Sequence, residues 1–123
     1  MSIATILIED SQTIRDALIP TMRELANLDV VAMADNSDSA IQILASHPWR
    51  LAVVDLFLKG GSGLEVLRHC IQRRADQHVV VLTNYATAEI RQKCLSLGAT
   101  AVFDKSTELD DFFIFCGDLF TQG

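Results

Sequence analysis

The chain has 123 residues, 50% of them hydrophobic, which is the size of one ordinary domain with enough apolar side chains for a core. Its formal net charge of -6 argues against direct binding to DNA or RNA, because phosphate binding needs clustered lysine and arginine. No apolar run is long enough to span a membrane, and the start, MSIATILIED, lacks the pattern of a secretory signal. We therefore expect a cytoplasmic protein that binds neither nucleic acid nor membrane.

Apolar runs typical of buried strands alternate along the chain with amphipathic helical patterns. Strands are predicted at residues 3–8, 29–34, 50–56, 78–83 and 100–104, and the last helix at residues 108–120. Continuous apolar strands joined by helices indicate a parallel sheet that right-handed crossovers cover on both faces. We expect one α/β domain over residues 1–123, a three-layer flavodoxin-like sandwich with strand order 2-1-3-4-5.

The helices are expected to begin at polar capping residues and to turn one apolar side to the core. Their starts are predicted at Ser11, at Asn36 or Ser37, after the glycine loop of residues 60–63, and near Thr87. The inward residues are predicted to be Ile14, Leu18, Met22, Leu25, Ile41, Leu44, Leu64, Leu67, Cys70, Ile71, Ile90, Cys94 and Leu97. Pro20 should kink or split the first helix, and Gly98 should end the fourth.

The cysteines and histidines show no spacing typical of a metal site. The cysteines fall on the apolar sides of helices without any CxxC pair, and we expect core residues at Cys70, Cys94 and Cys116. The histidines lie far apart, and we expect structural or solvated roles for His47, His69 and His78.

Polar side chains stand where the predicted strands end: Glu9 and Asp10 after the first, Asp55 after the third, Thr83 at the fourth and Lys105 at the fifth. Because these strand ends meet at one edge of a parallel sheet, the residues should converge where the winding direction reverses. Crowded carboxylates repel each other unless a cation joins them, and hard oxygen ligands suit Mg²⁺ (or Mn²⁺). A lysine for an anion and a hydroxyl donor complete a pattern that indicates phosphoryl transfer to a carboxylate.

Each of these residues also has a simpler interpretation. Glu9 and Asp10 could cap the first helix, Asp55 could be a loop acid, and Lys105 could be a surface charge. Polar residues are common at strand ends, but the convergence of all five on one edge favours a functional site.

Four motifs in order make the chain similar to the response-regulator receiver domain, the phospho-acceptor half of bacterial two-component signalling. They are the acidic pair in LIEDS, the acceptor in VVDLFLKGGSGLEVL, the hydroxyl in VVLTNYA and the lysine in GATAVFDKS, and the resemblance covers essentially all 123 residues. It implies that Asp55 accepts a phosphoryl group from the phosphohistidine of a histidine kinase or a histidine phosphotransfer protein. It also implies a signalling domain, similar to the single-domain chemotaxis regulators, rather than an enzyme.

The resemblance implies roles for the neighbouring residues as well. Asp10, Asp55 and the backbone carbonyl of Phe57 would bind the metal, and Glu9 would bind it directly or through water. Lys105 would pair with the phosphate. The domain would assist its own phosphorylation and dephosphorylation.

The output side departs from the family pattern. Thr83 would move toward the phosphate and pull the next loop inward, commonly together with a Tyr or Phe three residues before the lysine. That position is Val102 here, and Phe103 cannot simply substitute because adjacent strand residues point to opposite faces. We therefore expect the signal to travel mainly through residues 84–87.

Further departures concern the loops around the acceptor. Ser106 replaces a proline that often follows the lysine, so a trans peptide bond is expected there. Lys59 also stands where proline is frequent, and the glycines at 60–61 should make that loop more mobile. Phe57 and Tyr85 flank the path of attacking water, and two bulky rings there should slow hydrolysis of the phosphoryl group.

No output domain is predicted within the chain, so it would either act alone on a partner or belong to a longer protein. One apolar face of the last helix is formed by Leu109, Phe112, Phe113, Cys116 and Phe120, with Phe115 at its margin. Ile114 projects nearly opposite. It could be a scattered exposed residue, or part of a docking or homodimer surface together with the fifth strand.

Two other activities are excluded and one alternative stays open. A haloacid-dehalogenase-type phosphatase would need an acid where Phe57 stands, and a flavodoxin would need a hydroxyl- and glycine-rich loop in place of EDSQT. The open alternative is a pseudo-receiver, an interaction module that keeps the fold without phosphorylation, because Val102 leaves the usual switch incomplete.

Overall fold

The computed structural model describes residues 2–121. Within that range the elements are β1 (Ile3–Ile8), α1 (Gln12–Ala26), β2 (Leu28–Ala34), α2 (Ser37–Ser46), β3 (Leu51–Val54), α3 (Gly63–His69), η1 (Cys70–Gln72), β4 (His78–Thr83), α4 (Ala88–Ser96), β5 (Ala101–Asp104) and α5 (Leu109–Leu119). Strands and helices therefore alternate as the hydrophobic pattern predicts. None of the helices in this range is long and apolar enough to cross a membrane.

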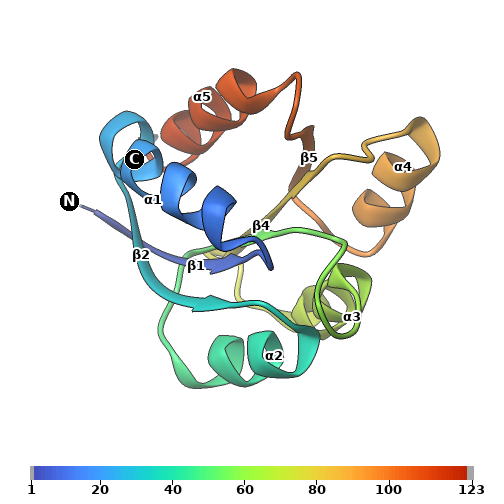
Figure 1. The fold of residues 1–123 in the computed structure, drawn as a ribbon. Coiled ribbons are helices and arrows are strands. Elements are labelled where there is room, and N and C mark those ends of the chain that lie inside the picture. Colours follow the sequence, from blue (N-terminus) through green and yellow to red (C-terminus); the bar gives the residue numbers. More distant parts are fainter. Residues whose placement is uncertain (1, 122–123) are drawn as a thin grey trace.

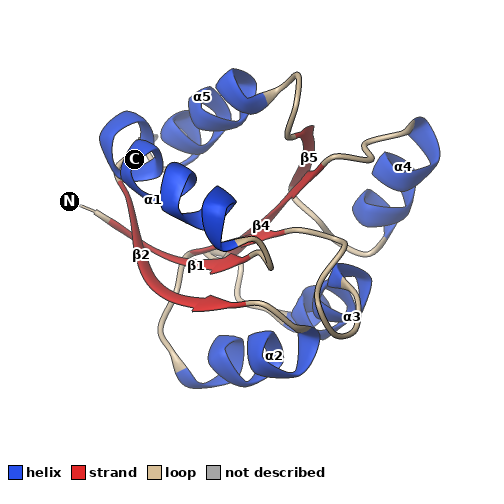
Figure 2. Ribbon diagram, in the orientation of Figure 1, coloured by secondary structure: helices blue, strands red, loops and turns tan. Residues whose placement is uncertain are grey.

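The strands form one parallel sheet in the order β2-β1-β3-β4-β5. Helices α1 and α5 cover one face of the sheet, and α2, α3 and α4 cover the other, which gives three layers (Figure 1 and Figure 2). The predicted flavodoxin-like class and strand order are confirmed. The winding direction reverses between β1 and β3, so the carboxyl ends of these two strands border the expected ligand edge.

Each face of the sheet has its own hydrophobic core. Successive residues of β3 show the division, because Val53 packs in the core under α1 and α5 while Val54 packs in the core under α2, α3 and α4. The first core also holds Met22 and Phe112, and the second holds Cys94. Burial of each such side chain contributes about 1.5–3 kcal/mol, so the two cores hold the strand ends in fixed positions.

The capping residues lie where the sequence predicts them. The side-chain oxygens of Ser11, Asn36 and Thr87 accept hydrogen bonds from the amides of Ile14, Ser39 and Ile90, at 3.3, 2.8 and 3.2 Å. Asn36 rather than Ser37 is therefore the cap of α2. Gly98 follows α4 with φ +94°, a left-handed conformation that suits glycine.

Some predicted helix positions are wrong. Leu25 is 59% exposed because Ala26, not Leu25, closes the buried stripe of α1. Ile71 is 51% exposed because the chain changes to a 3₁₀ turn after His69, which rotates this side chain out of the α-helical stripe. In α2 the buried positions are Ala40 and Leu44, with Ile43 packed beside them, and Ile41 is only half-buried.

The structure also differs from the prediction at Pro20 and at the end of the third strand. Helix α1 runs without a break through Pro20, so the predicted split is wrong. Pro20 removes the helical hydrogen bond to the Asp16 carbonyl, but both residues lie on the exposed side of the helix, where that carbonyl is accessible to water. Strand β3 ends at Val54, so Asp55 lies in the loop immediately after the strand rather than within it.

The cysteines and histidines occupy the expected environments. Cys70, Cys94 and Cys116 are buried, and burial raises the pKa of the Cys116 thiol to about 12. His47 and His69 are exposed. His78 is half-buried, with its ring edge-on to Phe120 at 5.7 Å between centroids.

The environment of His78 predicts a pH dependence of stability. Partial burial, and then the charges of Arg73 and Arg50, lower the pKa of His78 below its ordinary value of 6.5, and Asp76 opposes this shift. The unfolded chain therefore takes up a proton near pH 6.5 before the folded chain does, so the free energy of unfolding should fall as pH drops below 6.5. The free energy of unfolding should stop falling once the pH lies below the pKa of His78 in the folded protein.

Urea denaturation of wild type and His78→Gln between pH 7.5 and pH 5 checks this prediction. The free energy of unfolding of wild type should fall relative to that of His78→Gln as the pH drops below 6.5, because glutamine does not titrate. Parallel pH profiles for the two proteins would contradict it.

Candidate functional site

The acidic residues predicted from the strand ends come together at one edge of the sheet. Glu9 and Asp10 follow β1, and Asp55 follows β3, the strand hydrogen-bonded beside it. The Asp55 amide continues this pairing by donating to the Ile8 carbonyl at 2.9 Å. One carboxylate oxygen from each acid lies within 4.8 Å of the other two. Glu9 and Asp55 are buried and Asp10 is half-exposed, so the cluster opens to solvent on the Asp10 side.

Lys105 reaches this cluster from the end of β5. Its ammonium Nζ forms an ion pair with Glu9 Oε1 and lies 3.2 Å from Asp55 Oδ2. The remaining oxygens accept from backbone amides: Asp55 Oδ1 from Leu56 at 2.8 Å, and Glu9 Oε2 from Ser11 at 3.1 Å. Burial raises the pKa of Glu9 above its usual range, and the hydrogen bond from Lys105 is the largest opposing effect.

The charges at this edge do not balance among these residues. Three carboxylates face one ammonium, and buried like charges repel each other in proportion to their closeness. The donor set consists of hard carboxylate oxygens with no sulfur or imidazole among the three clustered residues. This chemistry and the open side at Asp10 fit Mg²⁺, which keeps several waters and binds through one or two carboxylates.

Thr83 lies along the same edge, at the end of β4. It is fully buried, and its hydroxyl oxygen accepts a hydrogen bond from the Tyr85 amide at 3.2 Å. Its carbonyl accepts from the Lys105 amide at 2.9 Å, so the threonine and the lysine are held side by side through the backbone. The structure thus brings Glu9, Asp10, Asp55 and Lys105 into one cluster and Thr83 onto the adjoining strand end.

The loop between β3 and α3 depends on two glycines. A Cβ on Gly63 would lie 2.2 Å from the Asp55 carbonyl oxygen, so only glycine permits this approach. Gly61 has φ +78°, and a Cβ there would lie 1.8 Å from Ser37 Oγ. Two hydrogen bonds, from the Ser37 amide to the Gly60 carbonyl and from the Lys59 amide to the Asp35 carbonyl, tie the loop to the start of α2. These contacts tie the loop to α2, and the greater mobility expected from the glycines at 60–61 stays a prediction.

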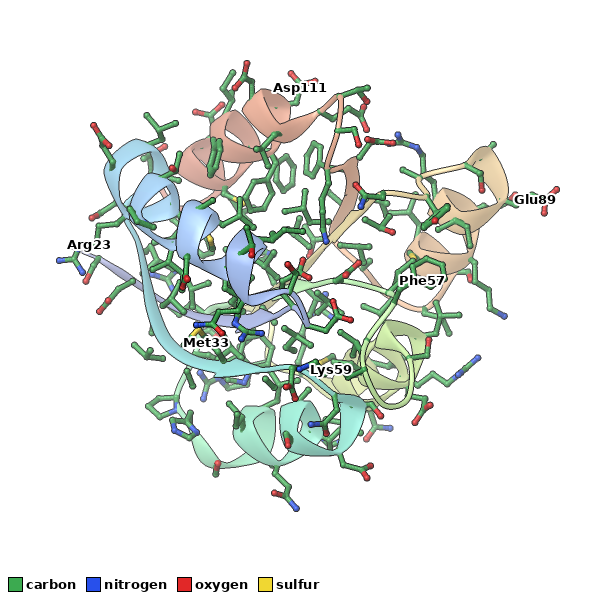
Figure 3. All side chains as sticks on the ribbon, in the orientation of Figure 1. Arg23, Met33, Phe57, Lys59, Glu89 and Asp111 are labelled. Atoms are coloured by element: carbon green, nitrogen blue, oxygen red, sulfur yellow. The ribbon has the colours of Figure 1, made fainter. Side chains whose placement is uncertain are left out.

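Phe57 and Tyr85 meet at the rim of the site. Phe57 is 53% exposed and points out from the loop after β3 (Figure 3). Its ring lies edge-on to that of Tyr85, with 4.8 Å between centroids. The two residues expected to flank the acceptor are thus in contact with each other.

Val102 and Phe103, where β5 departs from the usual pattern, point to opposite faces of the sheet as expected. Val102 is buried in the core under α2, α3 and α4, whereas Phe103 points to the other face and packs against the rings of Phe112 and Phe115. Phe103 therefore does not replace the missing aromatic side chain. The described residues contain no cis peptide bond, so the bond between Lys105 and Ser106 is trans, as predicted.

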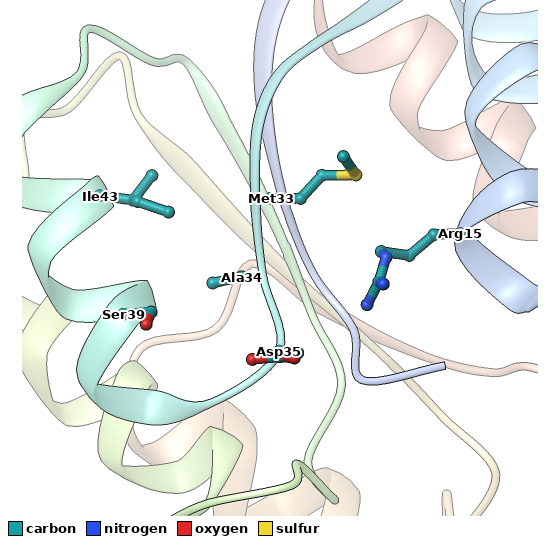
Figure 4. A pocket seen from close by; sticks show the side chains of 6 residues that line it. All are labelled: Arg15, Met33, Ala34, Asp35, Ser39 and Ile43. Carbon is teal, nitrogen blue, oxygen red and sulfur yellow. The ribbon is translucent and has the colours of Figure 1, made fainter. Parts of the chain in front are cut away.

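Arg15 is a site residue that the sequence pattern did not indicate. Its guanidinium donates to the Glu9 carbonyl at 2.6 Å and so fixes the turn between β1 and α1. An open hollow of about 380 Å³ beside it is lined by Arg15, Met33, Ala34, Asp35, Ser39 and Ile43 (Figure 4). None of the clustered acids lines this hollow, so it is separate from the acid cluster. Only the folded chain places Arg15 against Glu9, since no motif links the two.

A family model described as the response regulator receiver domain matches residues 5–114 of this chain. Among curated proteins, the chain is 28% identical over 103 residues to the transcriptional regulatory protein CitB of Klebsiella pneumoniae, a match covering 84% of this chain. The chain spans only 43% of the length of CitB.

Solved structures give the same fold. The signal receiver domain of a DNA-binding response regulator from Colwellia psychrerythraea 34H matches with a TM-score of 0.86 at 20% identity, over 98% of this chain and 100% of that chain. A LuxR-family DNA-binding response regulator from Staphylococcus aureus matches with a TM-score of 0.85 at 18% identity, over 95% of this chain and 98% of that chain. At these identities the likeness concerns the fold.

The close approach at Gly63 gives a stability prediction. Gly63→Ala should lower the free energy of unfolding by about 2–3 kcal/mol, because its Cβ would overlap the Asp55 carbonyl. Gly60→Ala is the matched control: its nearest neighbour would be Asn36 Cβ at 3.5 Å, and the change should stay within about 0.5 kcal/mol. Equal losses for the two variants in urea denaturation would contradict the prediction.

Proposed function

The chain belongs to the response regulator receiver domain family, and on that basis we propose that Asp55 accepts a phosphoryl group from the phosphohistidine of a histidine kinase or histidine phosphotransfer protein. The observation that supports this most directly is the convergence of Glu9, Asp10, Asp55 and Lys105 on one edge of the sheet. The complete acceptor set does not favour the pseudo-receiver alternative. The whole chain, residues 1–123, would act as one receiver domain in the cytoplasm.

The contacts of Asp55 suggest which of its oxygens reacts. Oδ1 is held by the Leu56 amide, which leaves Oδ2, beside Lys105, as the nucleophile. The bond between phosphorus and the donor imidazole breaks as the bond to Asp55 Oδ2 forms, and the imidazole leaves with the electron pair. Mg²⁺ (or Mn²⁺), held by Asp10, Asp55, the Phe57 carbonyl and Glu9 directly or through water, would neutralise charge on the phosphoryl oxygens.

Lys105 and Thr83 change partners in this proposal. The Lys105 ammonium exchanges its contacts with the two acids for a phosphoryl oxygen. The Thr83 hydroxyl leaves the Tyr85 amide, donates to another phosphoryl oxygen and draws residues 84–87 inward. Because Val102 replaces the usual aromatic residue, the loop movement carries the signal.

The phosphorylation proposal is tested by incubating the protein with acetyl phosphate and Mg²⁺ and measuring the intact mass. Wild type should gain the mass of one phosphoryl group, and Asp55→Asn should gain none. Asp111→Asn, an acid-to-amide change on the exposed surface of α5, should behave as wild type. No mass gain in wild type would refute the acceptor role and leave the pseudo-receiver.

The contact between Phe57 and Tyr85 supports a slow loss of the phosphoryl group, since two rings held together beside the acceptor would hinder attacking water. In the double variant Phe57→Ala with Tyr85→Ala, the phosphoryl group should be lost about tenfold faster, which corresponds to a barrier lower by ~1.4 kcal/mol. The control is Leu95→Ala, which removes an exposed apolar side chain from a different place, helix α4. The decay of phosphorylated protein, followed by mass, measures the rates, and slower or unchanged loss in the double variant would refute shielding.

Helix α5 is the proposed docking surface, for a homodimer or for a downstream protein that is not identified. Ile114 is 63% exposed and lines a hollow of about 350 Å³ with Leu25, Asp110 and Phe113. The fifth strand would extend this surface. Light scattering with and without beryllofluoride should show a mass increase that Ile114→Ala reduces. A constant monomer mass in both conditions would exclude the homodimer.

A further inference from the structure

Arg91 makes a set of contacts that neither the motifs nor the proposed chemistry uses. It lies in the first half of α4, and its guanidinium donates to three acceptors from three other segments. These are the carbonyl of Ala86 at 2.8 Å, the carbonyl of Val102 at 3.2 Å, and Glu108 Oε1 at 2.6 Å. The planar, rigid fork of arginine suits several fixed acceptors at once, which a lysine ammonium on its flexible stem cannot match.

Glu108 extends the same network to the end of β5. The Oε1 atom that pairs with Arg91 also accepts from the Asp104 amide at 2.9 Å. The hydrogen bond from Arg91 lowers the pKa of Glu108, so the carboxylate stays charged in this position. One guanidinium and one carboxylate thus join the loop after β4, helix α4, strand β5 and the start of α5.

Both ends of this network adjoin the acceptor site. Ala86 lies three residues after Thr83, within the loop that would move inward, and Asp104 immediately precedes Lys105. The loop and the turn are joined a second time by the hydrogen bond from Ser106 Oγ to Asn84 Oδ1 at 3.3 Å. A displacement of residues 84–87 therefore pulls directly on Arg91.

Simple stabilisation does not account for this arrangement. The Arg91 and Glu108 side chains are 34% and 31% exposed, and ion pairs this accessible to water contribute little to global stability. What the pair does is fix the relative positions of segments far apart in sequence, at the place where the aromatic switch residue is absent. Val102 itself takes part only through its carbonyl.

We propose that Arg91 is a positioning residue of the acceptor site, which with Glu108 couples the Thr83 loop and the Lys105 turn to the start of α5. This inference rests on the proposed phosphorylation of Asp55. The pair keeps the Thr83 loop and the Lys105 turn in a fixed relation to each other, so that both meet the phosphoryl group together. When the phosphoryl group draws Thr83 and its loop inward, Arg91 transmits the displacement to Glu108, and α5 responds.

The test measures Mg²⁺-dependent binding of beryllofluoride together with amide NMR shifts at residues 108–112. Wild type should bind and shift these amides. Arg91→Gln should bind about five- to tenfold more weakly and shift residues 108–112 much less, while Leu56 and Lys105 amides still respond. Arg91→Lys should behave like Arg91→Gln, because the guanidinium geometry is lost although the charge is kept. Lys93→Gln, another basic residue of α4, should match wild type.

A double-mutant cycle separates coupling from general loss of stability. Arg91→Gln combined with Glu108→Gln should weaken binding no more than the stronger single change, because both remove one network. Thermal melts run alongside: a lower melting temperature with unchanged affinity and unchanged α5 shifts would mean a structural role only and overturn the proposal. If Arg91→Gln does not fold, Arg91→Lys and Glu108→Gln decide by the same criteria. Wild type that binds no beryllofluoride would overturn the proposed function, and this inference with it.

Discussion

The ion pairs of Lys105 with Glu9 and Asp55 are the interaction on which the site depends. Burying two carboxylates beside each other is costly without a compensating charge, and Lys105 supplies that charge from the end of β5, the outer strand of the sheet. Removal of the lysine would leave two buried acids facing each other. The same arrangement leaves an excess of negative charge at the half-exposed Asp10, which a divalent cation bound there would offset.

The fold serves this cluster by fixing where the strands end. Parallel pairing of β1 with β3 places Asp55 next to the acidic pair, and the two hydrophobic cores keep these strands from sliding. Gly63 allows the chain to turn directly against the Asp55 carbonyl, and contacts with the start of α2 hold the rest of the loop. Backbone pairing and packed cores therefore position Asp55 on the side of β1 and β3. On the side of β4 and β5, backbone pairing is supplemented by side-chain hydrogen bonds, which exchange more readily than a packed core.

Val102 changes how that second side can work. An aromatic side chain at this position could change rotamer with the threonine loop, but a buried valine has little freedom to do so. The Arg91–Glu108 pair occupies the same region and joins the same segments by polar contacts. In a receiver domain built in this way, the displacement would reach α5 through the contacts of an arginine rather than through a change of rotamer of an aromatic side chain.

Hydrophobic periodicity determined the alternating elements and the parallel sheet, and it brought the strand ends close to Glu9, Asp55, Thr83 and Lys105, because these patterns repeat locally along the chain. The strand order followed from the fit of a five-unit chain of this size to the flavodoxin-like fold. Local patterns failed where a helix changes type or ends, as at Ile71 and Leu25, since the neighbours that cover a side chain are set by packing. Only the tertiary structure decided that Lys105 pairs with both acids, that Arg15 holds the Glu9 carbonyl, and that Arg91 meets Glu108. These contacts join residues whose separation in sequence follows no period, so their partners exist only once the layers have packed.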